Sequence, residues 1–231
     1  MTPDDLLPVH GGEFLMGQAD GRDEERPPHR VTLAPFRLCR YQVTNADYDH
    51  FRKATLRDKS EYRDRAEFCD PAQPVVAVNW FDAVAFCHWQ GEQWKLHLRL
   101  PTEAEWEFAA RGGFAERLYP WGDALPAIAA DRWRHGPESV GLGDPNGYGL
   151  FDLCQNVHEW CGDWYDPGYY AVSPVENPQG PGHGKRRASR GGAWRHHIKV
   201  SRCAARSSIP PEFRYSDYGF RVAAGHPDAP L

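Results

Sequence analysis

The sequence predicts an α+β domain with little regular secondary structure. Nine Trp, ten Tyr and eleven Phe accompany only two Met, so large rings dominate the apolar residues. Twenty-two Gly and twenty Pro are spread along the 231 residues, and all recognisable helix starts lie in the first half of the chain. This combination is typical of a loop-rich domain whose core is filled by aromatic side chains.

Short apolar segments bounded by turn residues come first. The segment from Gly11 to Gly17 (GGEFLMG) predicts a strand between glycines. A charged loop that ends in Pro27-Pro28 follows, and two more strands are expected at Arg30–Leu33 and Phe36–Arg40. The chain therefore begins with strands.

Three helix starts share one signature, in which a short polar residue precedes the helix and an acid follows three positions later. The pairs are Thr44 with Asp47, Asn79 with Asp82, and Thr102 with Glu105. The polar side chain accepts from first-turn amides, and the acid lies near the positive end of the helix. We expect about three helices, near residues 45–53, 80–92 and 103–110.

The region after Gly113 lacks helical periodicity. Strands are expected near Tyr119–Trp121, Ser189–Ala193, Ser201–Arg206 and Gly219–Val222. So long a region with little regular structure needs another source of order, such as ring packing or a bound ion.

Bulk properties exclude several classes of partner. Net charge is −5 with both signs interspersed, and Lys185-Arg186-Arg187 is the longest basic run, so we expect no nucleic-acid ligand. No apolar run reaches the ~20 residues of a membrane helix, and the first residues do not resemble a signal peptide, which predicts a cytoplasmic protein without membrane contact. The six Cys form no Cys-x-x-Cys pair, and we expect them to be reduced and mostly buried.

Several motifs occur in an order that resembles one known family. They are Pro74-Val75-Val76-Ala77-Val78-Asn79-Trp80, Arg99-Leu100-Pro101-Thr102-Glu103-Ala104-Glu105-Trp106, Tyr119-Pro120-Trp121-Gly122, Asn146-Gly147-Tyr148-Gly149-Leu150-Phe151-Asp152, Gln155-Asn156-Val157-His158-Glu159-Trp160, Arg190-Gly191-Gly192-Ala193-Trp194 and Gly219-Phe220-Arg221. Together they resemble the formylglycine-generating-enzyme, or sulfatase-modifying-factor, family. The resemblance implies a single domain over 1–231, with its core at about 9–224 and a C-type-lectin-like fold.

Formylglycine-generating members of this family oxidise a substrate cysteine with copper(I) held by two cysteines shortly after the Gly-Gly turn. Soft thiolates suit copper(I), so the pair is a chemical requirement. The first cysteine position falls at or near His196 here, and the second has no thiol counterpart. Ala193 stands where the turn of these members has Ser, and His158 stands where they tend to have Trp. We therefore expect no formylglycine generation and, on balance, no enzymatic activity.

The histidines leave an alternative open. His196 and His197 are adjacent, and neighbouring side chains on an extended segment point to opposite faces. One of them could meet His158 or His183 in space and hold iron or copper. The alternative function is an oxidase or oxygenase of the same family with a His-based metal site.

Calcium is the cofactor that the resemblance implies. The matching positions are the side chains of Asp152 and Glu159 and the carbonyls of Gln155 and Val157. Oxygen ligands with two carboxylates suit this hard cation. The alternative is a capped turn, in which Asp152 accepts from nearby amides and Glu159 pairs with an Arg.

The family's ligand groove corresponds to the segment from Trp194 to Tyr218. The candidate ligand-binding residues are Trp194, Arg195, His196, His197, Lys199, Phe213, Arg214, Tyr215 and Asp217. Aromatic and Arg side chains of this kind form binding hot spots. The favoured function is a non-catalytic module that binds a protein or peptide. The segment also resembles variable proteins of diversity-generating retroelements.

Framework roles are expected for the remaining arginines and tryptophans. Arg190, Arg202, Arg206 and Arg221 recur between small and aromatic residues, and a buried guanidinium can satisfy several loop carbonyls at once. Trp106, Trp121, Trp160 and Trp164 are assigned to the core.

Overall fold

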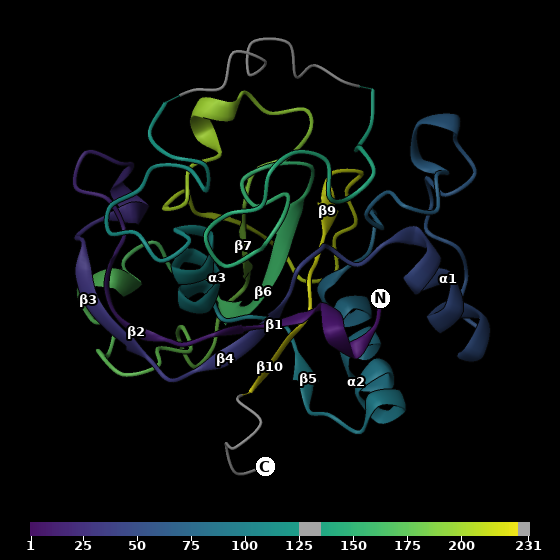
Figure 1. Cartoon of the computed structure of the whole chain (residues 1–231), viewed down its shortest axis with the longest axis horizontal. Helices are drawn as coiled ribbons and strands as arrows, with labels where there is room; N and C mark the ends of the chain where they lie inside the picture. The colour runs from purple at the N-terminus through teal and green to yellow at the C-terminus, as the bar shows by residue number, and fades with distance from the viewer. Residues whose placement is uncertain (125–134, 226–231) are drawn as a thin grey trace.

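The computed structural model describes residues 1–124 and 135–225 (Figure 1). Its α-helices are α1 (Asn45–Ala54), α2 (Trp80–Trp94) and α3 (Glu103–Ala110). Its strands are β1 (Leu6–Val9), β2 (Gly12–Met16), β3 (His29–Leu33), β4 (Phe36–Cys39), β5 (Leu98–Arg99), β6 (His158–Trp164), β7 (Arg187–Arg190), β8 (Ser207–Ile209), β9 (Tyr218–Gly219) and β10 (Ala223–Gly225). Short 3-10 turns lie at Pro3–Asp5, Asp23–Glu25, Ala66–Phe68, Tyr169–Ala171 and Ile198–Val200. The α+β class is as the sequence predicted.

Each α-helix begins where the sequence predicted it. Thr44, Asn79 and Thr102 accept from the amide three residues on, and the acid at that position bonds back to the cap. These reciprocal bonds satisfy two amides that otherwise lack a helical partner. The first three predicted strands are likewise present, as β2, β3 and β4.

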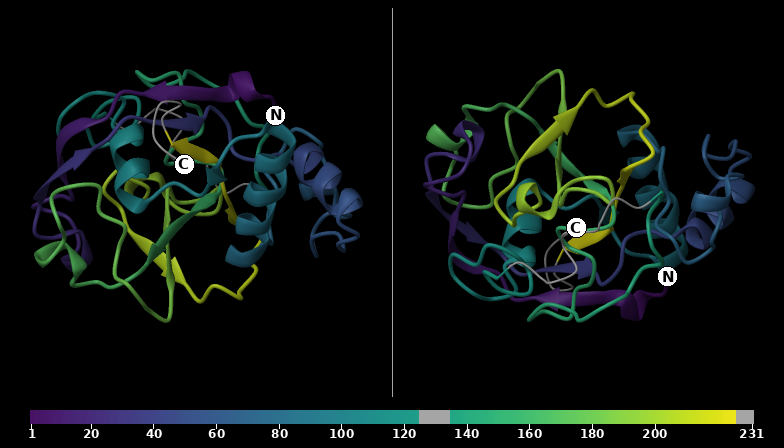
Figure 2. Two further views of the ribbon diagram at one scale, coloured as in Figure 1. Left: turned by 90° about the horizontal axis from the view of Figure 1, so that it is seen from below. Right: turned by 90° about the horizontal axis from the view of Figure 1, so that it is seen from above.

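The strands form two four-stranded sheets and a hairpin. One sheet has the order β1-β4-β10-β5 and the other β8-β7-β6-β9, while β2 and β3 pair with each other. The hairpin lies on one side of the molecule, and α1 and α2 lie side by side on the other (Figures 1 and 2). Within the second sheet, β6 runs antiparallel to β7 and parallel to β9.

Two strand predictions were wrong. Tyr119 and Gly122 exchange backbone hydrogen bonds of 3.1 and 3.0 Å, which makes an isolated bridge. At 201–206 the chain turns, since Ala205 N donates to Arg202 O at 2.9 Å. The strand near this segment, β8, begins only at Ser207. The sequence also did not predict β6, which is buried along most of its length.

Buried Arg–Glu pairs hold the loops to the core. Arg190 donates to Glu103 and Glu107 at 3.0 Å each, and Arg206 donates to both oxygens of Glu103 at 2.8 Å. Arg221 donates to both carboxylate oxygens of Glu159. Because these guanidinium groups also donate to loop carbonyls, they satisfy backbone groups that no sheet covers. The predicted framework role of the arginines is confirmed.

The core contains the aromatic side chains that the composition indicated. Trp106 and Trp160 are completely buried, while Trp121 and Trp164 are half-buried at its edge. All six cysteines are free thiols, and all but Cys69 are buried. None of the helices in residues 1–124 and 135–225 is long and apolar enough to cross a membrane.

Candidate functional site

The segment from Trp194 to Tyr218 does not form one continuous surface. Arg195, His197 and Lys199 are exposed, and so are the side chains of 213–215. Most of the residues between these two stretches are buried or half-buried, and they include β8. The predicted binding segment therefore presents two separate exposed parts.

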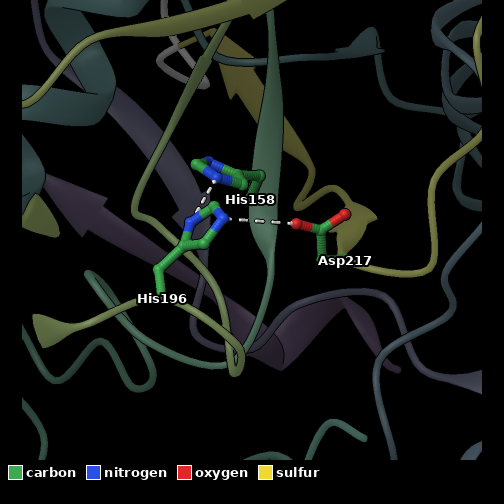
Figure 3. Close-up of side chains that lie close together, drawn as sticks. All are labelled: His158, His196 and Asp217. Atoms are coloured by element: carbon green, nitrogen blue, oxygen red, sulfur yellow. Dashed lines mark hydrogen bonds and ion pairs between the residues drawn. The ribbon is translucent and has the colours of Figure 1, made fainter. Parts of the chain in front are cut away.

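The first part contains a cluster of two histidines and one carboxylate (Figure 3). His158 Nε2 lies 3.1 Å from His196 Nδ1, and His196 Nε2 lies 3.8 Å from Asp217 Oδ2. One donor atom from each residue lies within 4.8 Å of the others. Among the described residues, this is the one group of three His, Cys, Asp or Glu side chains that are close enough together to hold a metal ion. The structure thus joins two histidines of the alternative prediction with a carboxylate that the sequence assigned to ligand binding.

Sheet pairing places two of these residues side by side. His158 begins β6 and faces Tyr218 of the parallel strand β9. His158 N donates to Asp217 O at 2.8 Å, which fixes Asp217 beside the histidine.

The Gly191-Gly192 turn leads the chain to His196, whose ring lies beside His158 and Asp217. Gly192 has a φ of +68°, and a Cβ there would lie 1.9 Å from Ser201 Oγ, so glycine is required. Trp194 N donates to Asn156 O at 2.7 Å, and His196 N donates to Ala193 O at 2.9 Å. These bonds hold the turn against the loop that precedes β6.

Burial favours the neutral form of both imidazoles. Burial, with smaller contributions from His196 and Arg195, lowers the pKa of His158 to about 3. Burial also lowers the pKa of His196, although the nearby Asp217 carboxylate opposes that change. A neutral imidazole keeps one nitrogen lone pair available for a hydrogen bond or a metal ion.

A small pocket of about 220 Å³ opens beside the two histidines. Its lining includes His158, His196, the two turn glycines, Arg22 and Arg206. No cysteine lines this pocket among the described residues. His196, at or near the position that the resemblance assigns to the first copper-binding cysteine, therefore places an imidazole at this pocket.

The second part lies at a larger cleft of about 530 Å³. Arg214 is in its wall and donates to Asp82 Oδ2 at 2.6 Å, while Arg57 donates to Asp82 Oδ1 at 3.2 Å. Phe213 and Tyr215 precede and follow Arg214 in the chain. Their rings pack edge-to-face on each other with centroids 5.9 Å apart, and they remain 42% and 39% exposed. Two exposed rings and an Arg at a cleft are the composition of a binding surface.

A ring series connects the two parts. Tyr215 packs on Tyr218 at 6.0 Å, Tyr218 stacks on His158 at 4.8 Å, and His158 meets His196 at 4.9 Å between centroids.

The other predicted residues lie apart from the cluster. His197 is exposed, and its Nδ1 accepts from Lys199 N at 3.1 Å. His183 is also exposed, and neither it nor His197 joins a metal-type group within the described residues. Trp194 packs edge-to-face against Phe68 and donates to Ser216 O at 3.3 Å. Asp217 is buried, so it cannot act as the surface contact that the sequence suggested.

One residue of the predicted calcium set, Glu159, has hydrogen bonds on both carboxylate oxygens in this structure. Glu159 accepts from Arg221 at 2.6 and 2.7 Å, from Trp106 Nε1 at 2.7 Å and from Gln42 Nε2 at 2.9 Å. Asp152 Oδ2 accepts from Gly141 N at 2.7 Å. Arg221 already supplies the positive charge that Glu159 binds, which is the alternative that the sequence left open. Glu159 thus pairs with Arg221 in this structure, and calcium at Asp152, Gln155, Val157 and Glu159 stays a prediction.

Two residues of the larger cleft were not identified from sequence. Asp82 was assigned only to helix capping, and Arg57 lies in an irregular charged segment. No local signal pairs Arg57 with Arg214 across Asp82. The available signal in the sequence was the position of Arg214 between two aromatic residues, and it did point to this surface.

Comparison with known proteins identifies a family. The model described as "Sulfatase-modifying factor enzyme 1-like domain" matches residues 1–225. A formylglycine-generating enzyme of Streptomyces coelicolor is 37% identical over 92% of this chain and 87% of its own length. An inactive C-alpha-formylglycine-generating enzyme 2 of Bos taurus is 30% identical, over 95% of this chain and 88% of its own. The relatives thus include proteins named as active and as inactive.

Solved structures agree on the fold. PvdO from Pseudomonas aeruginosa superposes with a TM-score of 0.83 at 28% identity, covering 95% of this chain and 93% of that one. Treponema denticola variable protein 1 superposes with a TM-score of 0.82 at 24% identity, covering 96% and 95%. The second likeness is one of fold alone, so the variable-protein interpretation stays a prediction.

Proposed function

This chain belongs to the sulfatase-modifying-factor domain family, and we propose that it is a ligand-binding module of that family that does not generate formylglycine. The ligand would be a protein or peptide segment held at the cleft beside Arg214. The observation that carries this proposal is the exposed pair of mutually packed rings, Phe213 and Tyr215, which are the chain neighbours of an Arg that lines the cleft.

The chemistry of the cleft favours a polar peptide. Its walls include three basic residues, Arg57, Lys59 and Arg214, and three acidic residues, Asp58, Glu61 and Asp82. Charges of both signs suit a ligand that has backbone amides and mixed side chains. The two rings would supply apolar contact area at low entropic cost, as at protein interfaces.

The cleft wall also contains a strained backbone position. Ala77 has a φ of +55°, a conformation that non-glycine residues seldom adopt, and Ala77 N donates to Tyr215 O at 3.0 Å. Positions of this kind persist where the surroundings hold them, and they cluster at binding sites. The hydrogen bond couples the cleft wall to the exposed Tyr215.

The absence of formylglycine generation follows from the pocket ligands. Copper(I) prefers soft thiolates, and the matching position is His196. Incubating the protein with copper, oxygen and a cysteine-bearing peptide should leave the cysteine unchanged. Conversion of the thiol to an aldehyde, detected by mass spectrometry, would refute this part of the proposal.

Binding can be tested without a known ligand by panning an unbiased displayed peptide library on the wild-type protein. Peptides enriched on wild type should bind Arg214→Ser and Tyr215→Ser variants at least about tenfold more weakly, since hot-spot residues contribute more than ~1.4 kcal/mol. Val172→Ser changes an apolar residue that is 77% exposed elsewhere and serves as the matched control. Equal binding to all three variants would place the site elsewhere.

A further inference from the structure

We propose that His158, His196 and Asp217 together hold one divalent first-row transition-metal ion beside the small pocket. The three residues come from the start of β6, the loop after β7 and the residue before β9 (Figure 3). This site goes beyond the peptide-binding cleft and uses none of the residues tested there.

The spacing of the donor atoms fits a shared ion. Ligands at about 2.0–2.2 Å from one ion lie about 3.0–3.5 Å from their neighbours in tetrahedral or octahedral geometry. The two imidazole nitrogens are already 3.1 Å apart, and the nearer carboxylate oxygen lies 3.8 Å from the other nitrogen of His196. Taken with one donor atom per residue, the group lies within 4.8 Å, so binding one ion requires the partly exposed His196 ring to turn toward the other two residues.

The two imidazoles already face each other through ring nitrogens. His158 Nε2 and His196 Nδ1 share a hydrogen bond of 3.1 Å, which an ion between the rings would replace.

The carboxylate is buried and only partly satisfied. Asp217 Oδ2 accepts from Arg195 Nε at 2.7 Å, whereas Oδ1 is buried and has no hydrogen-bond partner among the residues that the structure describes. A buried carboxylate oxygen without a partner is costly, and a bound cation would relieve that cost. Arg195 resembles the outer hydrogen-bond partners that orient ligating carboxylates in metal sites.

The donor set selects a class of metal. Two imidazoles and one carboxylate suit Fe²⁺, Co²⁺ or Zn²⁺ and leave coordination positions open toward the pocket. Copper(I) prefers thiolates, and calcium prefers a set made entirely of oxygens. The open positions adjoin the cavity of about 220 Å³, where a small ligand or water could complete the sphere.

The test begins with protein from which metals have been removed by a chelator. Co²⁺ is titrated in and its binding is monitored by visible d–d absorption, and Zn²⁺ binding is measured by calorimetry. We expect saturation at one ion per chain and no displacement by a large excess of calcium. His196→Ala and Asp217→Asn should each weaken Co²⁺ binding by more than about tenfold. Removing a residue that only hydrogen-bonds to a metal ligand already weakens metal affinity by about that factor.

His197→Ala is the matched control, since it removes the adjacent histidine, which lies outside the cluster. It should bind Co²⁺ as wild type does. His196 is partly exposed, so its variant should fold, and circular dichroism checks this for each protein. The proposal is overturned if wild type takes up no stoichiometric Co²⁺, or if His197→Ala weakens binding as much as a folded His196→Ala.

Discussion

Arg221 holds both carboxylate oxygens of Glu159, with Nε 2.6 Å from Oε2 and Nη2 2.7 Å from Oε1, and both side chains are fully buried. Trp106 and Gln42 donate to the same carboxylate. The pair joins the start of β6 to the segment between β9 and β10. Because Arg221 also donates to Phe151 O and Cys39 O, it fastens the loop at Phe151 and the end of β4 to its own segment.

Removing the acid of this pair should destabilise the protein strongly. Glu159→Gln leaves the Arg221 guanidinium buried without a counter-charge, which typically costs about 3–5 kcal/mol. Urea unfolding measures the change. Glu13→Gln is the control, since Glu13 and its partner Arg30 are largely exposed and surface pairs contribute about 0–1 kcal/mol. Similar losses in the two variants would show that burial of the pair is not what matters.

Thermal unfolding in calcium distinguishes the Arg221–Glu159 pair from the predicted calcium site that includes Glu159. Glu159 has no acceptor position left for the ion, since Arg221, Trp106 and Gln42 occupy both its oxygens. Thermal unfolding in excess calcium and in excess chelator should therefore give the same midpoint. A midpoint several degrees higher with calcium would restore the predicted set at Asp152, Gln155, Val157 and Glu159.

Asp163 should make stability fall as pH rises. Burial, with a further contribution from the Glu103 carboxylate, raises the pKa of Asp163 from 3.8 to about 8. The folded state then binds this proton more tightly than the unfolded chain, so the contribution is complete below about pH 4 and is lost by about pH 8. The neutral variant Asp163→Asn lacks this dependence.

The measurement is the difference in unfolding free energy between wild type and Asp163→Asn at several pH values. The difference cancels the opposing effect of His158. Because the pKa of His158 is lowered in the folded state, this residue removes stability as the pH falls below the ordinary pKa of histidine. It should favour wild type most at low pH and decline through the window from 4 to 8. Asp166→Asn removes an exposed carboxylate as the control. A flat difference for Asp163→Asn would contradict the assignment.

Thr102 should contribute to stability through its cap. Its Oγ1 accepts from Glu105 N at 3.1 Å, and Glu105 in turn accepts from Thr102 N at 2.8 Å. Thr102→Ala should cost about 0.5–2 kcal/mol in chemical denaturation. Thr102→Ser keeps the acceptor and should lose much less, so equal losses would assign the effect to the methyl group.

Local hydrogen bonding explains which parts of the fold were predictable. The caps at Thr44, Asn79 and Thr102 act within four residues, so their sequence is enough to place the helices. The strand expected at 201–206 failed because Cys203 N donates instead to Leu118 O at 2.8 Å, a contact that no neighbouring residue specifies. β6 was missed because both its faces are covered, which removes the alternation of polar and apolar residues.

The sequence by itself determined the fold class, the family, the helix starts and the structural use of the arginines, because these depend on local patterns and ordered motifs. It also indicated that the thiol pair of the family is missing. Only the tertiary structure decided that His158 meets His196 across 38 residues, that Asp217 is buried beside them, and that Glu159 binds Arg221. The pairing of β6 with β9 and the Gly191-Gly192 turn set those contacts. Such long-range geometry follows from packing of the whole chain, which residue spacing does not encode.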